Sequence, residues 1–284
     1  MKFKIVIVLL FSFFTINSSA QKTEKVKNNL PNGLTEEYYV LTDSNSVKQG
    51  AYILKDQKGK LYEKGNYLNG AKEGLWETYS WEGTTTSGTY KNGLKEGMWK
   101  EKGGSGNYLH DIKSGEWKEM NGTGNYLNGN RSGEWIFTSK SGKKEQIYDY
   151  TISKIVWYDS TALGYSPIEA KILINGDSQT VKLDHAPLYI GGNDALSHYI
   201  SYTLRYPIIE KEMGKQGTVY VTYDVDSTGK ILNFRIAKGV ANAPGLAKES
   251  IRVLELTSGS WYPATYQGNP ISMSVTQAVR FVLQ

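Results

Sequence analysis

A short aromatic motif recurs along the first half of the chain and restricts the fold more than any other feature. Each copy holds a tyrosine, a turn dipeptide, a second glycine and a tryptophan, as in the stretch from Gly65 to Trp76. Successive copies are 23, 18 and 18 residues apart, as shown by Trp76, Trp99, Trp117 and Trp135. A period near 20 residues predicts one supersecondary unit that is stacked repeatedly in a row.

Each copy predicts a β-hairpin. A Tyr-bearing strand ends at Asn-Gly, the pair favoured where a two-residue turn needs positive φ at both positions, and a Trp-bearing strand follows. The second glycine, four residues after the first, suits a longer turn or a bulge. In the third copy His110-Asp111 replaces Asn-Gly, so we expect a wider or differently shaped turn there. A degenerate earlier copy starts at Gly50-Ala-Tyr52.

The aromatic rows admit two interpretations. Tyrosine and tryptophan either form a shared ladder core, or they present an exposed face that stacks on glycan rings or lipid headgroups. Basic residues recur two residues after each turn. They form either a stripe that meets an anionic surface or plain solvated turns, and they are Lys72, Lys95, Lys113 and Arg131.

These G-x-Y-x-N-G-x-x-x-G-x-W copies resemble MORN-type repeats, in the variant of the YwqK-like antitoxin repeat family. The resemblance covers about residues 50–140. It implies a β-hairpin repeat sheet. The segment at 145–185 is a β-rich bridge that either extends this sheet or forms a small sheet of its own, with strands expected at 155–158, 171–174 and 180–183 and a turn at 175–177.

The last hundred residues predict a small α+β domain. The expected order is helix, strand, strand, helix, strand, with a short helical turn at 208–213 after the first helix. Alternation of apolar and polar residues indicates one buried face in the strands, with the helices on one sheet face. The expected ranges of the five elements are 193–204, 219–225, 231–237, 245–256 and 271–283.

Local signals place element ends and faces within this domain. Asn193 is expected as the N-cap of the first helix, and Pro207 disfavours helix at the residue before it. In the second strand, strict alternation places Leu232, Phe234 and Ile236 on the same side. The fold class that follows is mainly β plus α+β: an N-terminal hairpin repeat sheet and a small C-terminal domain.

Over about residues 186–284 the chain resembles the C-terminal domain of the TonB energy transducers. In that family the domain does no chemistry and accepts a TonB-box peptide from an outer-membrane receptor along its terminal strand. A second contact follows a Tyr-Pro pair. The matching features here are Tyr206-Pro207, Gly217 before an alternating strand, the Asp226-x-x-Gly229 turn, Trp261-x-Pro263-Ala264 and the terminal strand.

By this resemblance we place partner binding on the terminal strand, with a secondary contribution from residues 208–215. Pairing there would be β-strand addition, in which backbone groups give affinity and neighbouring side chains give register. The expected contact residues are Ser274, Val275, Thr276, Gln277, Ala278, Val279, Arg280, Phe281, Val282 and Leu283, together with Lys211.

Two features depart from the family's best-known members. They carry a glutamine where Lys211 stands, which predicts altered peptide recognition. They also begin with a membrane helix and a Pro-rich span, whereas this chain carries aromatic repeats. We therefore expect a binding module rather than a device that transmits force in the usual way.

The first 20 residues predict a secretory signal peptide. Lys2 and Lys4 precede an apolar run from Ile5 to Ile16, and small residues lead to cleavage after Ala20. The alternative is a retained anchor, but the run of about 12 residues is shorter than the ~20 that a spanning helix needs. We expect the mature protein in the periplasm, possessing no spanning helix after cleavage.

Composition and motifs favour a non-enzymatic protein. Without Lys2 and Lys4 the formal charge falls from +5 to +3, which does not predict nucleic-acid binding. The three histidines have no partners at metal-ligand spacing and the chain has no cysteine, so we expect no metal and no cofactor. No nucleophile elbow or phosphate loop is found either.

The leading hypothesis is a periplasmic protein that binds an extended peptide of an outer-membrane receptor or another envelope protein. The alternative is an envelope scaffold or adhesion protein that acts through its repeats and homodimerises through the C-terminal domain. The expected division is a signal peptide at 1–20, a lead-in at 21–49, repeats at 50–144, the bridge at 145–185 and the C-terminal domain at 186–284.

Overall fold

The computed structural model describes residues 21–80, 83–160, 169–174 and 177–283. The predicted signal peptide and residues 175–176 of the expected turn at 175–177 lie outside the described residues. Across the described ranges, no helix combines the length and the apolar character that crossing a membrane requires. The chain divides into two compact units, residues 1–96 and 97–284, and each is described by itself.

The first unit is a row of antiparallel strands that pair in sequence order. The expected lead-in begins with two of these strands, which no aromatic motif marks. The strands are β1 (Thr23–Asn29), β2 (Leu34–Leu41), β3 (Ser44–Asp56), β4 (Leu61–Leu68), β5 (Ala71–Ser80) and β6 (Gly83–Lys91).

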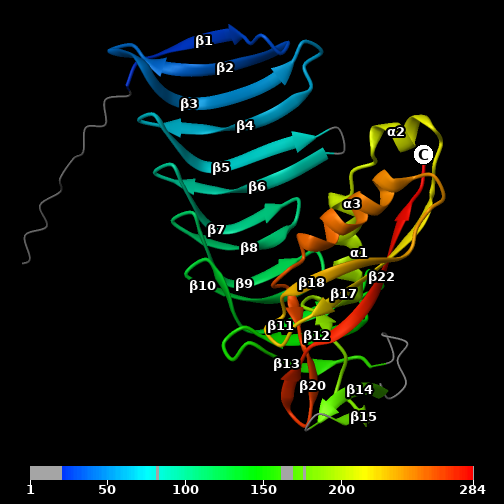
Figure 1. Cartoon of the computed structure of the whole chain (residues 1–284). Helices are drawn as coiled ribbons and strands as arrows, with labels where there is room; N and C mark the ends of the chain where they lie inside the picture. The colour runs from blue at the N-terminus through cyan, green and yellow to red at the C-terminus, as the bar shows by residue number, and fades with distance from the viewer. Residues whose placement is uncertain (1–20, 81–82, 161–168, 175–176, 284) are drawn as a thin grey trace, which may run out of the picture. The chain divides into compact units, whose positions relative to one another are not determined.

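The same arrangement is found in the second unit, again with each strand beside the next in sequence (Figure 1). The strand at 154–158 of the expected bridge extends this row, and the two that follow form a separate hairpin, so both interpretations of the bridge hold in part. The strands are β7 (Leu94–Glu101), which begins in the first unit, β8 (Gly104–Leu109), β9 (Ile112–Glu119), β10 (Gly122–Leu127), β11 (Asn130–Thr138), β12 (Lys144–Asp149), β13 (Lys154–Tyr158), β14 (Glu169–Ile174) and β15 (Asp177–Lys182).

The hairpin turns confirm the role of the Asn-Gly pairs. Asn69 and Gly70 have φ of 49° and 84°, as a two-residue turn of mirror-image type requires. His110 and Asp111 have φ of 50° and 67°, so the third copy makes the same turn and the expectation of a wider one is wrong. The physical reason is that the turn requires two residues at positive φ, and an aspartate tolerates that region.

The second glycine of each copy lies in a bulge. Gly115 has φ of 64°, and the pairing of β8 with β9 shifts register beside it, between Gly106 and Asn107. The corresponding glycines of the other clear copies also have positive φ. Of the two options that the spacing left open, the bulge is the one that the structure shows.

Tyrosines and tryptophans form a buried ladder along one face of the strands. In the second unit Tyr108 meets Trp117 edge to face at 5.2 Å between ring centroids, and Tyr126 meets Trp135 at 5.4 Å. The Trp117 indole donates a hydrogen bond to the backbone oxygen of Asn107 at 2.9 Å. The four motif tryptophans are at most 2% exposed, which confirms the ladder-core interpretation.

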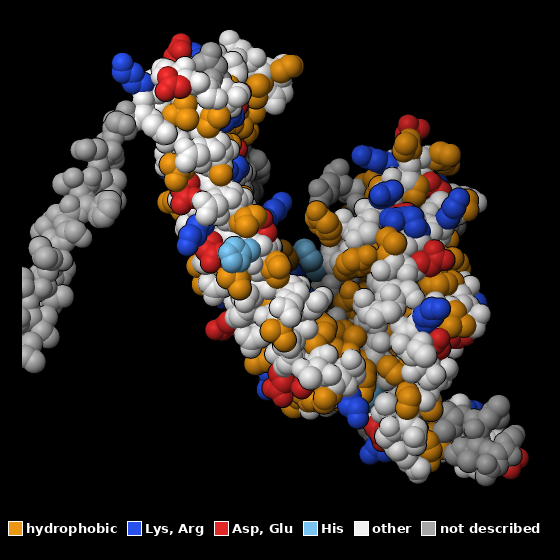
Figure 2. Space-filling view, turned by 90° about the vertical axis from the view of Figure 1, so that its left-hand side faces the viewer, with side chains coloured by type: hydrophobic (Ala, Val, Ile, Leu, Met, Phe, Trp, Pro, Cys, Tyr) orange, Lys and Arg blue, Asp and Glu red, His pale blue; other side chains and the backbone are white. Residues whose placement is uncertain are grey.

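The recurring basic residues belong to this ladder, which neither sequence interpretation anticipated. Lys113 Nζ lies 4.0 Å from the centroid of the Trp117 ring and 3.2 Å from a carboxylate oxygen of Glu119. Arg131 lies over Trp135 at 4.4 Å and pairs with the same glutamate. Each cation therefore covers a ring and is neutralised locally. On the face drawn in Figure 2, basic and acidic side chains are interspersed.

The C-terminal part of the second unit is the expected helix-strand-strand-helix-strand domain. Its sheet has the order β18-β17-β22, and two helices cover one face of it (Figure 1). Its elements are α1 (Gly192–Thr203), α2 (Ile208–Glu212), β17 (Gly217–Val225), β18 (Ile231–Lys238), α3 (Pro244–Glu255) and β22 (Met273–Phe281), with the small pairs β16 (Leu188–Tyr189) with β19 (Trp261–Tyr262) and β20 (Ala264–Tyr266) with β21 (Asn269–Ile271).

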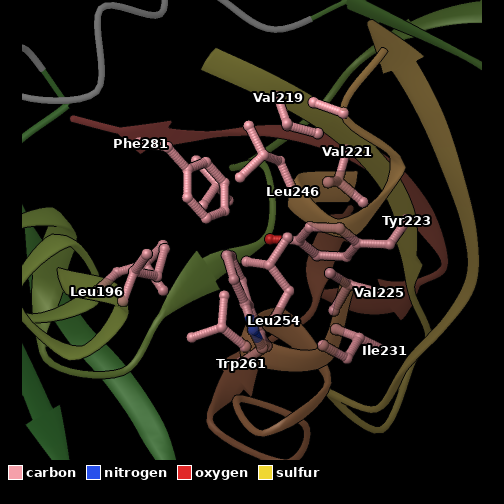
Figure 3. Close-up of a cluster of buried hydrophobic side chains, with 14 residues drawn as sticks. Leu196, Val219, Val221, Tyr223, Val225, Ile231, Leu246, Leu254, Trp261 and Phe281 are labelled. Carbon is pink, nitrogen blue, oxygen red and sulfur yellow. The ribbon is translucent and has the colours of Figure 1, made fainter. Parts of the chain in front are cut away.

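One core holds this domain together. Leu196 of α1 and Leu246 of α3 meet alternate residues of β17, which point toward them as Figure 3 shows. The core residues from β17 and β22 are Val219, Val221, Tyr223, Val225, Val279 and Phe281, all at most 1% exposed. The alternation in the first and last strands thus predicts the buried face correctly.

Two local predictions within this domain are wrong. Gly191, not Asn193, is the N-cap of α1, because a carboxylate from elsewhere in the fold meets this helix end. In β18, Leu232 pairs with Asp224 and lies on the solvent face of the sheet. Phe234 lies on the other face. Asn233 has φ of 55° and forms a bulge there, which ends the strict alternation. Ile231 takes the buried place instead.

Candidate partner-binding edge

The terminal strand β22 lies at an edge of its sheet. It pairs with β17 over nine residue pairs, from Gly217 opposite Phe281 to Val225 opposite Met273, without a shift in register. Among the described residues no strand pairs with its other side. In an antiparallel pair, alternate residues direct their backbone N–H and C=O groups away from the partner. The outer side of β22 therefore carries a regular row of hydrogen-bonding groups.

The predicted contact residues occupy this strand and its end. Ser274 to Phe281 lie on β22, and Val282 and Leu283 follow it directly. Ser274, Thr276 and Ala278 are exposed on the face away from the helices, where their side chains would lie beside those of an added strand. Val279 and Phe281 are buried in the core, so their side chains anchor the strand and only their backbone faces outward.

The opposite edge of the sheet is irregular. The pairing of β17 with β18 shifts register twice, near Tyr220 and near Asp224. Arg235 and Lys238 are exposed on this strand. Bulges and charged side chains discourage strand pairing at an edge. The sheet therefore has one regular edge and one irregular edge, and the regular edge is the one that the sequence indicated.

The segment after Tyr206-Pro207 lies close to the end of β22. The Tyr206 ring meets Phe281 edge to face at 5.6 Å, and the Tyr206 hydroxyl donates a hydrogen bond to the backbone oxygen of Lys215. Lys211 lies between Tyr206 and Lys215 in the sequence, and its side chain is exposed on α2. The structure thus brings the predicted secondary segment and the terminal strand to one end of the domain.

Three exposed apolar side chains on and beside α2 were missed from the sequence. Ile208 is 74% exposed, Ile209 is 68% exposed and Met213 is 59% exposed. The signal was present as an Ile-Ile pair at the start of a five-residue helix, too short to bury two adjacent large residues on one core. They add an apolar surface beside Lys211.

The solvent face of the sheet carries a polar network centred on Asp224. This carboxylate accepts hydrogen bonds from Arg235 at 3.0 Å, Ser274 at 2.5 Å and Asn233 at 2.9 Å. The hydrogen bond from Arg235, and after it that from Ser274, lowers the pKa of Asp224 to about 2. The network therefore ties the three strands of the sheet together, from β18 to β22.

Residues 202–283 match the family model of the Gram-negative bacterial TonB protein C-terminal. The match covers α2, α3 and the three-stranded sheet, and it supports a TonB C-terminal domain in this part of the chain. A comparison with curated proteins gave no match.

The TonB C-terminal domain indicates a TonB-like protein of the cell envelope that is linked to energy transduction. Domains of this family interact with outer-membrane receptors or other envelope proteins, and they are not enzymes. Across the described ranges, no group of three or more His, Cys, Asp or Glu residues is placed to hold a metal ion.

Proposed function

We propose that the TonB C-terminal domain binds an extended segment of an envelope protein by β-strand addition along β22. The observation that carries this proposal is the regular outer edge of β22, with no strand beside it among the described residues. A guest strand would satisfy the outward N–H and C=O groups of β22 and extend the sheet by one strand. Contact residues would run from Ser274 to Leu283.

The second contact of this proposal is made by α2. Lys211 and the exposed Ile208 and Ile209 lie on the segment that Tyr206 fastens to the end of β22. A guest strand that continues past Phe281 would meet apolar side chains and one positive charge. The expected partner is an outer-membrane receptor or another envelope protein whose extended segment has alternating apolar residues.

Disulfide trapping tests the edge directly. The chain has no cysteine, so a single introduced thiol reports one position without background. In residues 21–284, Ala278→Cys places a thiol on β22, and Ala237→Cys places one on β18, with both alanines exposed. A TonB-box-like peptide that carries one cysteine is expected to crosslink with the Ala278→Cys variant and to leave the Ala237→Cys variant free.

Two further measurements make the outcome decisive. In NMR titrations of the unmodified chain, the same peptide is expected to shift amide signals of residues 274–283. Lys211→Ala is expected to weaken binding by roughly threefold, as for one exposed charge. Equal crosslinking at both alanines would sink the proposal. So would shifts confined to residues outside 274–283.

The alternative remains an envelope scaffold that acts through its repeats, with the C-terminal domain as a dimeriser. Because the four motif tryptophans are buried, this alternative cannot act by stacking their ring faces on glycans. A pull-down in which residues 21–150 capture every partner of the whole chain would support this alternative. The MORN-type identity of the repeats, the domain limits, cleavage after Ala20 and the periplasmic location are part of the proposal.

A further inference from the structure

A cleft of about 280 Å³ lies beside α1, within the second unit. One wall comes from the turn after β9 and from β11, and the other comes from α1 and the residues before it. We call it the α1 cleft, and its lining includes Asn121, Arg131, Asp194, His198 and Tyr202. It is separate from β22, none of whose residues line it.

The two walls of the cleft are fastened to each other. Buried Gln146 of β12 donates a hydrogen bond to the backbone oxygen of Tyr189 at 3.1 Å and accepts one from the backbone N–H of Gly191 at 2.8 Å. Asp194 accepts a hydrogen bond from the backbone N–H of Lys140 at 2.7 Å. Because these contacts hold the segment before α1 on the repeat strands, the cleft is preformed.

The charges around the α1 cleft are already compensated. Arg131 donates to Glu119 at 2.5 Å and to the Tyr150 hydroxyl at 2.8 Å, and it lies over the Trp135 ring. The lining holds Arg131 and Lys140 as cations and Asp194 as an anion, and Arg131 is paired with Glu119, which Lys113 shares. A charged ligand would have to compete with these internal partners, so a neutral ligand fits better.

Flat aromatic surface and polar groups occur together in this cleft. His198 and Tyr202 stack with an interplanar angle of 22°, and Tyr202 is 83% exposed. The Asn121 amide and the Thr138 hydroxyl line the same cleft and can donate or accept hydrogen bonds. A ligand ring that offers an apolar face and a rim of hydroxyl groups would match this combination. We propose that the α1 cleft binds one ring of a neutral sugar, stacked on Tyr202.

The test uses the chain from residue 21 to 284 and simple probes. Methyl glycosides of glucose, galactose and N-acetylglucosamine are the neutral probes, with glucuronate and phenylalanine amide as charged probes. In NMR titrations at least one glycoside is expected to bind in the millimolar range and to shift amides of α1 and of residues 120–121. Glucuronate is expected to bind more weakly than the neutral glycosides.

Variants separate stacking from general disturbance. Tyr202→Ala is expected to weaken glycoside binding by roughly fivefold, whereas Tyr202→Phe retains it. Tyr220→Ala, which removes a partly exposed tyrosine on the far face of the sheet, should leave binding unchanged. The proposal is overturned if no neutral glycoside binds, if phenylalanine amide binds in their place, or if Tyr202→Ala has no effect. Ala278→Cys should not alter glycoside binding, so this test is independent of the β22 edge.

Discussion

At the scale of single residues, the glycine two positions before the motif tyrosine shows how the aromatic ladder packs. Gly65, Gly106 and Gly124 lie directly against a tryptophan ring of the next strand. A Cβ atom on Gly106 would come within 2.3 Å of the Trp117 ring. Glycine within a strand often marks such a close approach, and an aromatic ring that covers it restores the missing packing.

Gly106→Ala is therefore expected to destabilise the protein by about 1–3 kcal/mol, because the ring must move out of the ladder. Gly103→Ala is the matched control, since a Cβ atom there meets no atom within 4 Å. Urea unfolding followed by tryptophan fluorescence measures both variants. Equal stability of the two would show that the ring does not require a glycine beneath it.

Asp224 gives a prediction on pH dependence. Its pKa is lowered to about 2 in the folded state, chiefly by the hydrogen bond from Arg235, so its contribution to stability is fully present above the ordinary pKa of 3.8. It is lost as the pH falls from about 4 to 2. Asp224→Asn is expected to reduce the free energy of unfolding by about 1 kcal/mol at pH 7 and by almost nothing at pH 2. A difference that is the same at both pH values would contradict this.

At the scale of elements, α1 depends on a strand that is distant in sequence. No side chain at Gly191 can cap this helix, and the Glu145 carboxylate of β12 instead accepts a hydrogen bond from the backbone N–H of Asp194 at 3.4 Å. Burial raises the pKa of Glu145, with the nearby Asp194 carboxylate acting in the same direction. The helix N-terminus offers partly positive N–H groups, which suit this carboxylate.

Gln146→Ala is expected to destabilise the contact between β12 and the segment before α1 by about 1–3 kcal/mol. The substitution leaves the backbone groups of Tyr189 and Gly191 without their buried partner. Gln179→Ala is the control, since this exposed glutamine lies on β15. Hydrogen exchange followed by mass spectrometry is expected to show faster exchange over residues 188–196 in the Gln146 variant. Unchanged exchange over that segment would contradict the role given to Gln146.

At the scale of the whole molecule, the second unit joins the last repeats to the TonB C-terminal domain. Tyr148 and Phe137 of the repeat strands pack with Ile190 and Tyr262 of the C-terminal part. Removal of the repeats exposes these residues and the groups that Gln146 satisfies. The domain limits of the family and the limits of the folded unit are therefore different.

A fragment of residues 186–284 is accordingly expected to melt at least about 5 °C below a fragment of residues 97–284, which keeps every contact of the second unit. Circular dichroism during heating measures both. A midpoint that is the same for the two fragments would show that the repeats give the C-terminal domain no support.

Much of the fold follows from local signals in the sequence. Residues that tolerate positive φ predict the positions of the repeat turns, and the recurrent tryptophans predict the ladder. Alternation in residues 219–225 and 271–283 identifies the buried sheet face. These signals act within one hairpin or one strand, so they need no knowledge of distant neighbours. The candidate edge was reached through family resemblance, and alternation alone did not identify it.

The sequence by itself determined where the repeat hairpins turn and which faces of β17 and β22 are apolar. Tertiary structure decided which strand lies at the edge, because the order β18-β17-β22 depends on packing under α1 and α3. It also decided that Asn233 bulges, that Glu145 meets the end of α1, and that cations cover the tryptophan rings. Each of these depends on contacts between residues far apart in the chain, which no local pattern records.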